Sequence, residues 1–131
     1  MALIKGMRLA SAVTAINVLV GSGFSIVGIL RPQYLLPAGA APTDASLIMA
    51  MYAAASKTPL ALFVLAAIYN RATTTLLYLG ALAGTVQLLD GGIGLYEHDP
   101  QKAAGPITIA VIQLLVVYRL YRSVQPRQKP L

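Results

Sequence analysis

Residues 9–30 read LASAVTAINVLVGSGFSIVGIL, a run of 22 residues without a charged side chain. A helix that crosses the hydrocarbon core of a bilayer needs about 20 mostly apolar residues. Three further stretches have a similar length and few charges: residues 45–70, 72–96 and 105–122. The sequence therefore predicts an all-α fold, a four-helix transmembrane bundle. We expect residues 1–131 to form a single integral membrane domain.

The composition agrees with a membrane protein. Apolar residues make up 57% of the chain and charged residues only 11%, whereas a soluble domain carries roughly 25% charged residues. This excludes a disordered chain and argues against an ordinary soluble domain. Prolines lie between the apolar runs, and proline suits the first turn of a helix. We therefore expect Pro106 to open the fourth helix, and Thr43 or Asp44 to cap the second.

The start of the chain also has some features of a signal peptide, because Lys5 and Arg8 precede the first apolar run. That run is longer than the usual apolar segment of about 7–15 residues, and no small-residue cleavage site follows it. We expect it to be retained as the first span.

The basic residues predict the orientation in the membrane. If the four helices alternate in direction, one side holds seven basic residues and the other holds only Arg31 and Lys102; the seven are Lys5, Arg8, Arg71, Arg119, Arg122, Arg127 and Lys129. Basic residues accumulate on the cytoplasmic side, so we expect both termini there, in the plasma (inner) membrane. The net charge of +6 then indicates contact with anionic lipid rather than nucleic-acid binding.

Several kinds of chemistry are excluded by residue type. The chain has no cysteine and one histidine, His98. Disulfides, cysteine-ligated metals, thiol catalysis and multi-histidine metal sites are therefore excluded for this chain. The sequence predicts no metal site and leaves the cofactor unknown. His98 lies in the polar segment 97–99, which we interpret as a solvated loop, with titration or metal binding as the alternative.

Each predicted span carries small or polar residues at intervals of three and four, which places them on one helical face. Helices in lipid associate through such small residues, so we expect these faces to meet and the apolar faces to contact lipid. The residues are Thr14, Asn17, Gly21, Ser25 and Gly28; Ala50, Ala54, Lys57 and Ala61; Gly80, Gly84, Gln87 and Gly91; and Pro106, Ala110, Gln113 and Val117.

Lys57 and Asp90 are the candidate catalytic residues. A charge near the bilayer centre costs about 2.5–3.5 kcal/mol on insertion scales, which predicts a buried lysine that faces the bundle interior. Asp90 on the next span is the expected partner. Pro59 donates no hydrogen bond to the carbonyl of Ala55 and is expected to kink the helix beside the lysine. Two interpretations stay open: a site that binds or transfers a proton, and an ion pair that only orients the bundle.

Gln87, Gln113, Asn17 and Tyr52 are the candidate ligand-binding residues. Polar side chains inside a bundle also cross-link helices, which is the alternative for the first three. Tyr52, like most tyrosines of this chain, lies near a span end, where tyrosine commonly anchors a helix at the interface. The proline-containing segment 31–37 is expected to lie over the outer end of the bundle as a lid.

Together these features resemble the broad DoxX-like group of small four-span membrane proteins. The resemblance is carried by the four-span plan, the glycine-rich end of the first span before Arg31-Pro32, the Gln87-x-x-Asp90 pattern and the Gly105-Pro106 pair. Some members of that group are subunits of quinone-linked sulfur oxidation. The resemblance transfers no catalytic residue, and this chain has no cysteine to handle sulfur. Small multidrug exporters fit less well, because they use a glutamate in the first span and the first predicted span of this chain contains none.

Three hypotheses for function follow. The bundle core binds a lipophilic small molecule, such as a quinone, terpenoid or lipid, with proton transfer at Lys57. Alternatively, the chain is an oligomeric transporter or channel, or a non-catalytic accessory subunit of a larger membrane complex. The lipid bilayer is the one expected partner common to all three. Whether the protein is an enzyme stays open.

Overall fold

The computed structural model describes residues 1–125, which form four long helices and a short 3-10 turn, and no strand. The helices are α1 (Ala2–Leu30), α2 (Asp44–Tyr69), α3 (Thr73–Tyr96) and α4 (Pro100–Val124), with η1 (Pro32–Tyr34) after α1. All four are long and apolar enough to cross a membrane. The predicted all-α, four-helix fold of a small membrane protein is confirmed. The orientation of the termini stays a prediction, and Arg127 and Lys129 lie outside the described residues.

Two helix boundaries differ from the sequence prediction. α1 begins at Ala2, so the basic residues before the first span are helical too. α4 begins at Pro100 and not near Pro106. The prediction that Pro106 opens the helix was wrong, because Asp99 accepts hydrogen bonds from the backbone N–H groups of Gln101 and Lys102 and so starts the helix earlier. Pro106 lies within α4.

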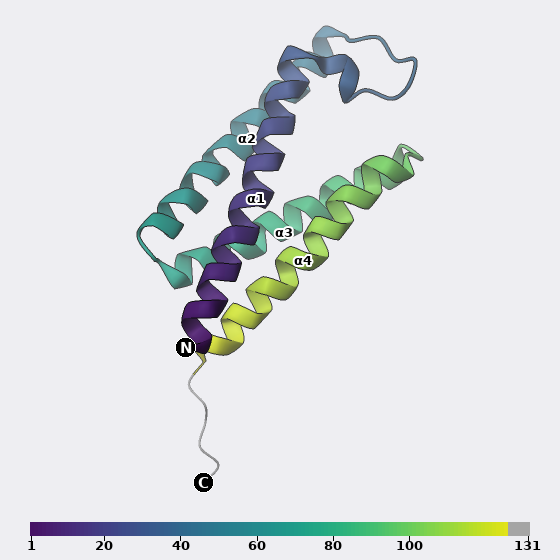
Figure 1. The fold of residues 1–131 in the computed structure, drawn as a ribbon. Helices are drawn as coiled ribbons and strands as arrows, with labels where there is room; N and C mark the ends of the chain where they lie inside the picture. The colour runs from purple at the N-terminus through teal and green to yellow at the C-terminus, as the bar shows by residue number, and fades with distance from the viewer. Residues whose placement is uncertain (126–131) are drawn as a thin grey trace.

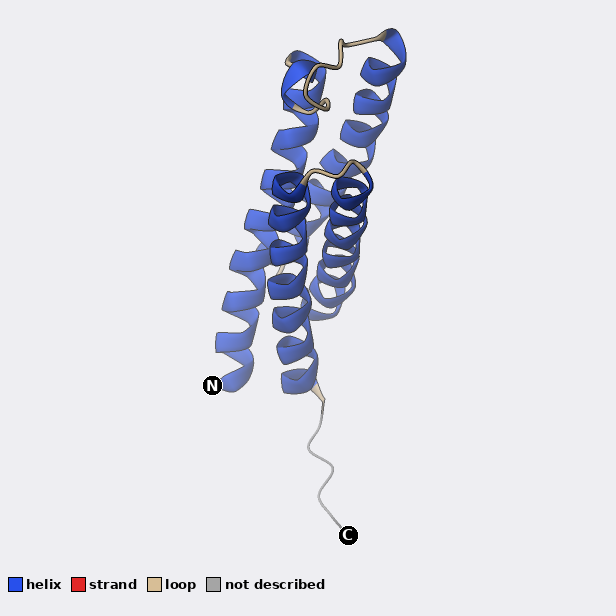
Figure 2. Ribbon diagram, turned by 90° about the vertical axis from the view of Figure 1, so that its right-hand side faces the viewer, coloured by secondary structure: helices blue, strands red, loops and turns tan. Residues whose placement is uncertain are grey.

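The helices form two antiparallel hairpins, α1–α2 and α3–α4 (Figures 1 and 2). Residue 1 and the C-terminal end of α4 lie at the same end of the bundle, together with the α2–α3 turn. We call this the terminal end, and the opposite end the distal end. At the terminal end the two hairpins are close together, and toward the distal end they diverge (Figure 1). α1 packs against α2, α4 and α3, and α3 packs against α4 and α2, whereas no Cα atom of α2 lies within 8 Å of one in α4.

The apolar core fills the half of the bundle nearer the terminal end. Its buried members come from all four helices: Ala10, Val18, Ala61, Val64, Leu76, Ala83, Val116 and Leu120. The small-residue faces predicted for α1, α3 and α4 are largely buried. On α2 only Ala61 of the predicted face is buried, while Ala50, Ala54 and Lys57 are half-buried. The distal part of α2 therefore borders open space.

Glycines let α3 approach α4 closely. A Cβ atom on Gly80 would lie 2.8 Å from the side chain of Val117, and one on Gly94 would lie 2.6 Å from the backbone nitrogen of Ala103. Real Cβ atoms essentially never come this close to other atoms. The α3–α4 contact thus depends on these glycines.

Two short turns lie at opposite ends of the bundle, one between α2 and α3 at the terminal end and one between α3 and α4 at the distal end. In each turn a non-glycine residue adopts the left-handed conformation, Arg71 with φ 52° and His98 with φ 55°. Each turn is closed by a six-residue backbone hydrogen bond, 2.9 Å from Ala72 to Ala67 and 3.0 Å from Asp99 to Gly94. This is the usual helix C-terminal motif, in which glycine commonly takes the left-handed position. The longer α1–α2 connection ends at Thr43, which forms a capping box with Ser46 and confirms one of the two expected caps.

Candidate functional site

A cavity of about 360 Å³ lies between the diverging hairpins, toward the distal end of the bundle. All four helices line it, and Leu35 from the connection after η1 closes part of its edge. Most of its wall is apolar, with Val20 and Phe24 from α1 facing Ile93 from α3 and Ile109 from α4. Its volume lies at the lower end of the range of about 300–1,000 Å³ typical of small-molecule sites. An apolar wall with few polar groups is the usual composition of such sites.

The Lys57–Asp90 ion pair forms part of this cavity wall. The ammonium nitrogen of Lys57 lies 2.6 Å from Oδ2 of Asp90 and donates a hydrogen bond to it. The pair joins α2 to α3, and so joins one hairpin to the other. The predicted pairing of these two side chains is confirmed as a contact.

The prediction of a buried lysine was wrong. The side chain of Lys57 is 23% exposed and that of Asp90 is 29% exposed, and no charged residue is buried in the described part of the chain. The reason is the divergence of the hairpins, which leaves a cavity where the sequence predicted a packed interior. The ion pair is thus available to a ligand in the cavity.

A chain of buried polar side chains continues from the cavity into the bundle. Gln87 donates from Nε2 to Oδ1 of Asn17 at 2.7 Å, and Asn17 donates from Nδ2 to Oε1 of Gln113 at 3.3 Å. Gln113 in turn donates from Nε2 to the hydroxyl of Thr14 at 2.8 Å. We call these four residues the amide ladder. It connects α1, α3 and α4, and its members are at most 6% exposed.

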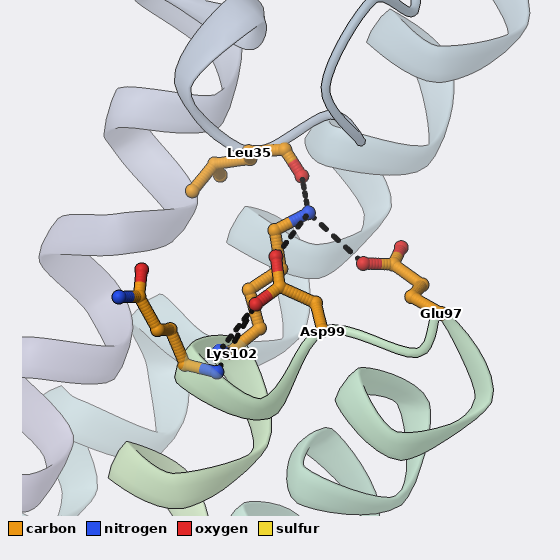
Figure 3. A network of polar contacts seen from close by, with 5 residues as sticks. Leu35, Glu97, Asp99 and Lys102 are labelled. Carbon is orange, nitrogen blue, oxygen red and sulfur yellow. Dashed lines mark hydrogen bonds and ion pairs between the residues drawn. The ribbon is translucent and has the colours of Figure 1, made fainter.

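A second group of charges lies at the distal rim of the cavity. The ammonium of Lys102 contacts the backbone carbonyl of Leu35 at 3.1 Å and the carboxylate of Glu97 at 2.9 Å, and Asp99 lies 3.9 Å away (Figure 3). Lys102 belongs to α4, whereas Leu35 follows α1. This contact therefore connects the two hairpins at the distal end. Of the segment 31–37, only Leu35 lines the cavity, and a lid over the outer end stays a prediction.

The structure brings some candidate residues together and separates others. Lys57, Asp90 and Gln87 line the cavity, with Asn17 and Gln113 in the ladder behind it. Tyr52 is 69% exposed and is not part of the cavity wall. Its outward position fits the alternative of an anchor at the membrane interface.

Sequence reasoning missed three residues of this region. Thr14 was recognised only as a small residue on the contact face, yet it ends the amide ladder. Glu97 and Lys102 were assigned to a solvated loop and to the topology count, yet they form the cavity rim. Their five-residue spacing carries no helical signal, because a turn and the start of α4 lie between them. Only the folded α3–α4 connection brings them together.

A larger apolar groove of about 590 Å³ lies on the outside of α3 and α4 near the terminal end, beside Tyr78, Tyr118 and Tyr121. None of the candidate catalytic or ligand-binding residues lines it. It is separate from the cavity between the hairpins.

No protein-family model, curated protein or solved structure matches this chain. The resemblance to the DoxX-like group therefore stays a prediction. The function must be argued from the cavity itself.

Proposed function

We propose that this small membrane protein binds a lipophilic molecule with a polar head group in the cavity between its hairpins. The observation that carries the proposal is the Lys57–Asp90 pair, which is accessible in a mostly apolar cavity lined by all four helices. The apolar wall suits a hydrocarbon, terpenoid or quinone skeleton. The ion pair suits the polar end of the same molecule.

The space for the head group lies beside Gly21. A Cβ atom at this position would be 3.6 Å from Nε2 of Gln87 and 4.0 Å from Cδ of Lys57. Both polar side chains therefore border the same glycine, and a small head group seated there meets both. We further propose that Lys57, which is hydrogen-bonded to Asp90, exchanges a proton with that head group.

The arrangement supports binding better than conduction by a single chain. The cavity lies in the distal half, the amide ladder closes the bundle at the inner end of the cavity, and the apolar core fills the half nearer the terminal end. A transporter or channel would need an oligomer or a large rearrangement. Transport and a purely structural accessory role remain the competing hypotheses, and flux measurements in liposomes distinguish transport from binding.

Native mass spectrometry in mild detergent, followed by organic extraction of the protein, tests the proposal directly. We expect a lipophilic adduct at near-stoichiometric amount. The matched variants are Gly21→Ala and Gly23→Ala. A methyl at position 21 meets ordinary contact distances and takes up head-group space, while one at position 23 meets nothing within 4 Å. Both variants should fold, and only Gly21→Ala should lose the adduct.

Lys57→Met provides a second test, with Lys5→Met as the control for removal of an exposed lysine. We expect the adduct to be lost only from the Lys57 variant. A wild-type protein that binds no lipophile, or a folded Lys57→Met variant with undiminished adduct, would contradict the proposed function.

A further inference from the structure

The orientation of the Gln87 amide narrows the chemistry of the head group. Its nitrogen donates to Asn17, so its oxygen Oε1 is the atom left for a ligand. Gln87 is 6% exposed, yet no fully buried side-chain nitrogen or oxygen in the described residues lacks a partner. Since Oε1 has no hydrogen bond within the described chain, it is not fully buried. Gln87 borders the cavity and a small space of about 20 Å³ beside it, and Lys57 lines both. In either space Gln87 presents a hydrogen-bond acceptor near Lys57.

The amide ladder couples this orientation to that of Asn17 and Gln113. Every link donates in the same direction, from Gln87 to Asn17, from Asn17 to Gln113, and from Gln113 to the hydroxyl of Thr14. If the Gln87 amide turned over, two carbonyl oxygens would face each other at its link to Asn17. If Asn17 turned over as well, its oxygen would meet that of Gln113. Turning one or two of the amides would therefore break buried hydrogen bonds, each of which is costly to leave unmade. The direction reverses only if all three amides turn together and the Thr14 hydroxyl then donates to Gln113.

The charges of the cavity favour a neutral head group. Its wall contains two cations and two carboxylates, and they are paired as Lys57 with Asp90 and Lys102 with Glu97. A carboxylate or ammonium ligand would have to displace one of these partners. The ammonium of Lys57 has three N–H groups and gives only one hydrogen bond, to Asp90, in the described chain. It can donate to an uncharged oxygen without breaking the pair.

We infer that the cavity selects a neutral lipophile that carries a hydroxyl group, with Gln87 as the specificity-determining residue. The hydroxyl hydrogen is donated to Oε1 of Gln87, and the hydroxyl oxygen accepts from Lys57. An ether or ester of the same size offers the acceptor but not the donor. This inference rests on the proposed function and adds the chemical class of the ligand.

The experiment compares dodecanol with its isomer methyl undecyl ether as competing probes on the full chain in lipid nanodiscs. The two molecules have the same number of heavy atoms and differ in the O–H donor. We expect the ether to bind about tenfold more weakly, because it leaves the buried acceptor of Gln87 unpaired. In Gln87→Met this preference should fall to about one, while Gln101→Met, which changes an exposed glutamine outside the cavity, should keep it.

Each outcome is decisive. Equal affinity for the two probes in the wild-type protein overturns the inference but leaves the proposed function standing. Failure to bind either probe overturns both. The wild-type comparison needs no variant, so it remains informative if Gln87→Met does not fold. Thr14→Val then serves as the second variant: it removes the last acceptor of the ladder, and we expect binding with a reduced preference for the alcohol.

Discussion

Both halves of this bundle have small and polar side chains on the inner faces of their helices. Toward the terminal end these faces are packed together, whereas toward the distal end they border a cavity. In the terminal half, small side chains let the hairpins close, and the apolar core is buried. The amide ladder beside it has no unpaired buried atom. In the distal half, the equivalent faces diverge around a cavity, and the polar groups stay 23–29% exposed in the Lys57–Asp90 pair. The comparison shows that polar residues inside a membrane bundle cross-link the helices where the helices are close together. Where the helices diverge, such residues stay accessible to a ligand.

The connections explain why the halves differ. The short turn between α2 and α3 joins the two hairpins at the terminal end, so the chain itself holds them together there. At the distal end no covalent link joins one hairpin to the other within the described chain. Only side-chain contacts do so, Lys57 with Asp90 and Lys102 with the carbonyl of Leu35. The distal half is therefore the part in which the hairpins can separate.

The largest effect is expected from Gln113→Leu in the closed half. This change removes the acceptor for Nδ2 of Asn17 and the donor to the hydroxyl of Thr14, at a cost of about 1–3 kcal/mol for each buried group. We expect the free energy of unfolding, measured in mixed micelles of SDS and mild detergent, to fall by about 2–4 kcal/mol. Gln101→Leu is the exposed control. If the free energy of unfolding fell by less than in the control variant, the amide ladder would not stabilise the bundle.

Gly80→Ala should have the next largest effect. The added methyl would lie 2.8 Å from Val117 and 3.1 Å from Nε2 of Gln113, and such overpacking costs about 1–3 kcal/mol. Gly92 lies on the same helix, and a methyl there meets nothing within 4 Å. Gly92→Ala should therefore be neutral or slightly stabilising. The same unfolding titration measures both, and equal effects would argue against a close contact between α3 and α4.

In the open half, the double variant Lys57→Met/Asp90→Leu should change the unfolding free energy by about 1 kcal/mol or less, because partly exposed ion pairs contribute little. Its ligand adduct should nevertheless disappear. Loss of stability comparable to that of Gln113→Leu, with the adduct retained, would instead assign the pair to the structural role.

Lys102→Met should loosen the distal rim with little effect on global stability, about 0.5 kcal/mol for exposed pairs of this kind. Because the carbonyl of Leu35 loses its contact, we expect faster hydrogen exchange in residues 33–36. Exchange in the terminal halves of the helices should stay unchanged. Uniformly faster exchange along the chain would mean that the two halves are not independent.

A small effect of the opposite sign is expected from His98→Gly. Histidine holds a left-handed conformation at φ 55°, which glycine adopts without steric cost. We expect thermal unfolding to show stabilisation of about 0.5–1 kcal/mol. The change lies in the α3–α4 turn, outside both the ladder and the ion pair, so ligand binding should not respond.

The candidate site was partly predictable. Lys57, Asp90, Gln87, Asn17 and Gln113 stood out because strongly polar side chains are rare in apolar spans. Their spacing also placed all of them except Asp90 on the small-residue face of the helix. The spacing could not predict which residue on another helix each one contacts. Even when the inner face of each helix is known, two helices can pack with many different rotations and shifts along their axes. The roles of Thr14 and Lys102 were therefore out of reach.

The sequence by itself determined that this chain forms four apolar helices, and which face of each is small and polar, because both follow from local composition and the helical repeat. The start of α4 was not determined in this way: the helix begins at Pro100 rather than Pro106, because Asp99 caps it. Only the tertiary structure decided that the hairpins close at one end and diverge at the other. That geometry comes from contacts between residues far apart in the chain. It buries the amide ladder, of which only Gln87 borders the cavity, and it leaves the Lys57–Asp90 ion pair accessible.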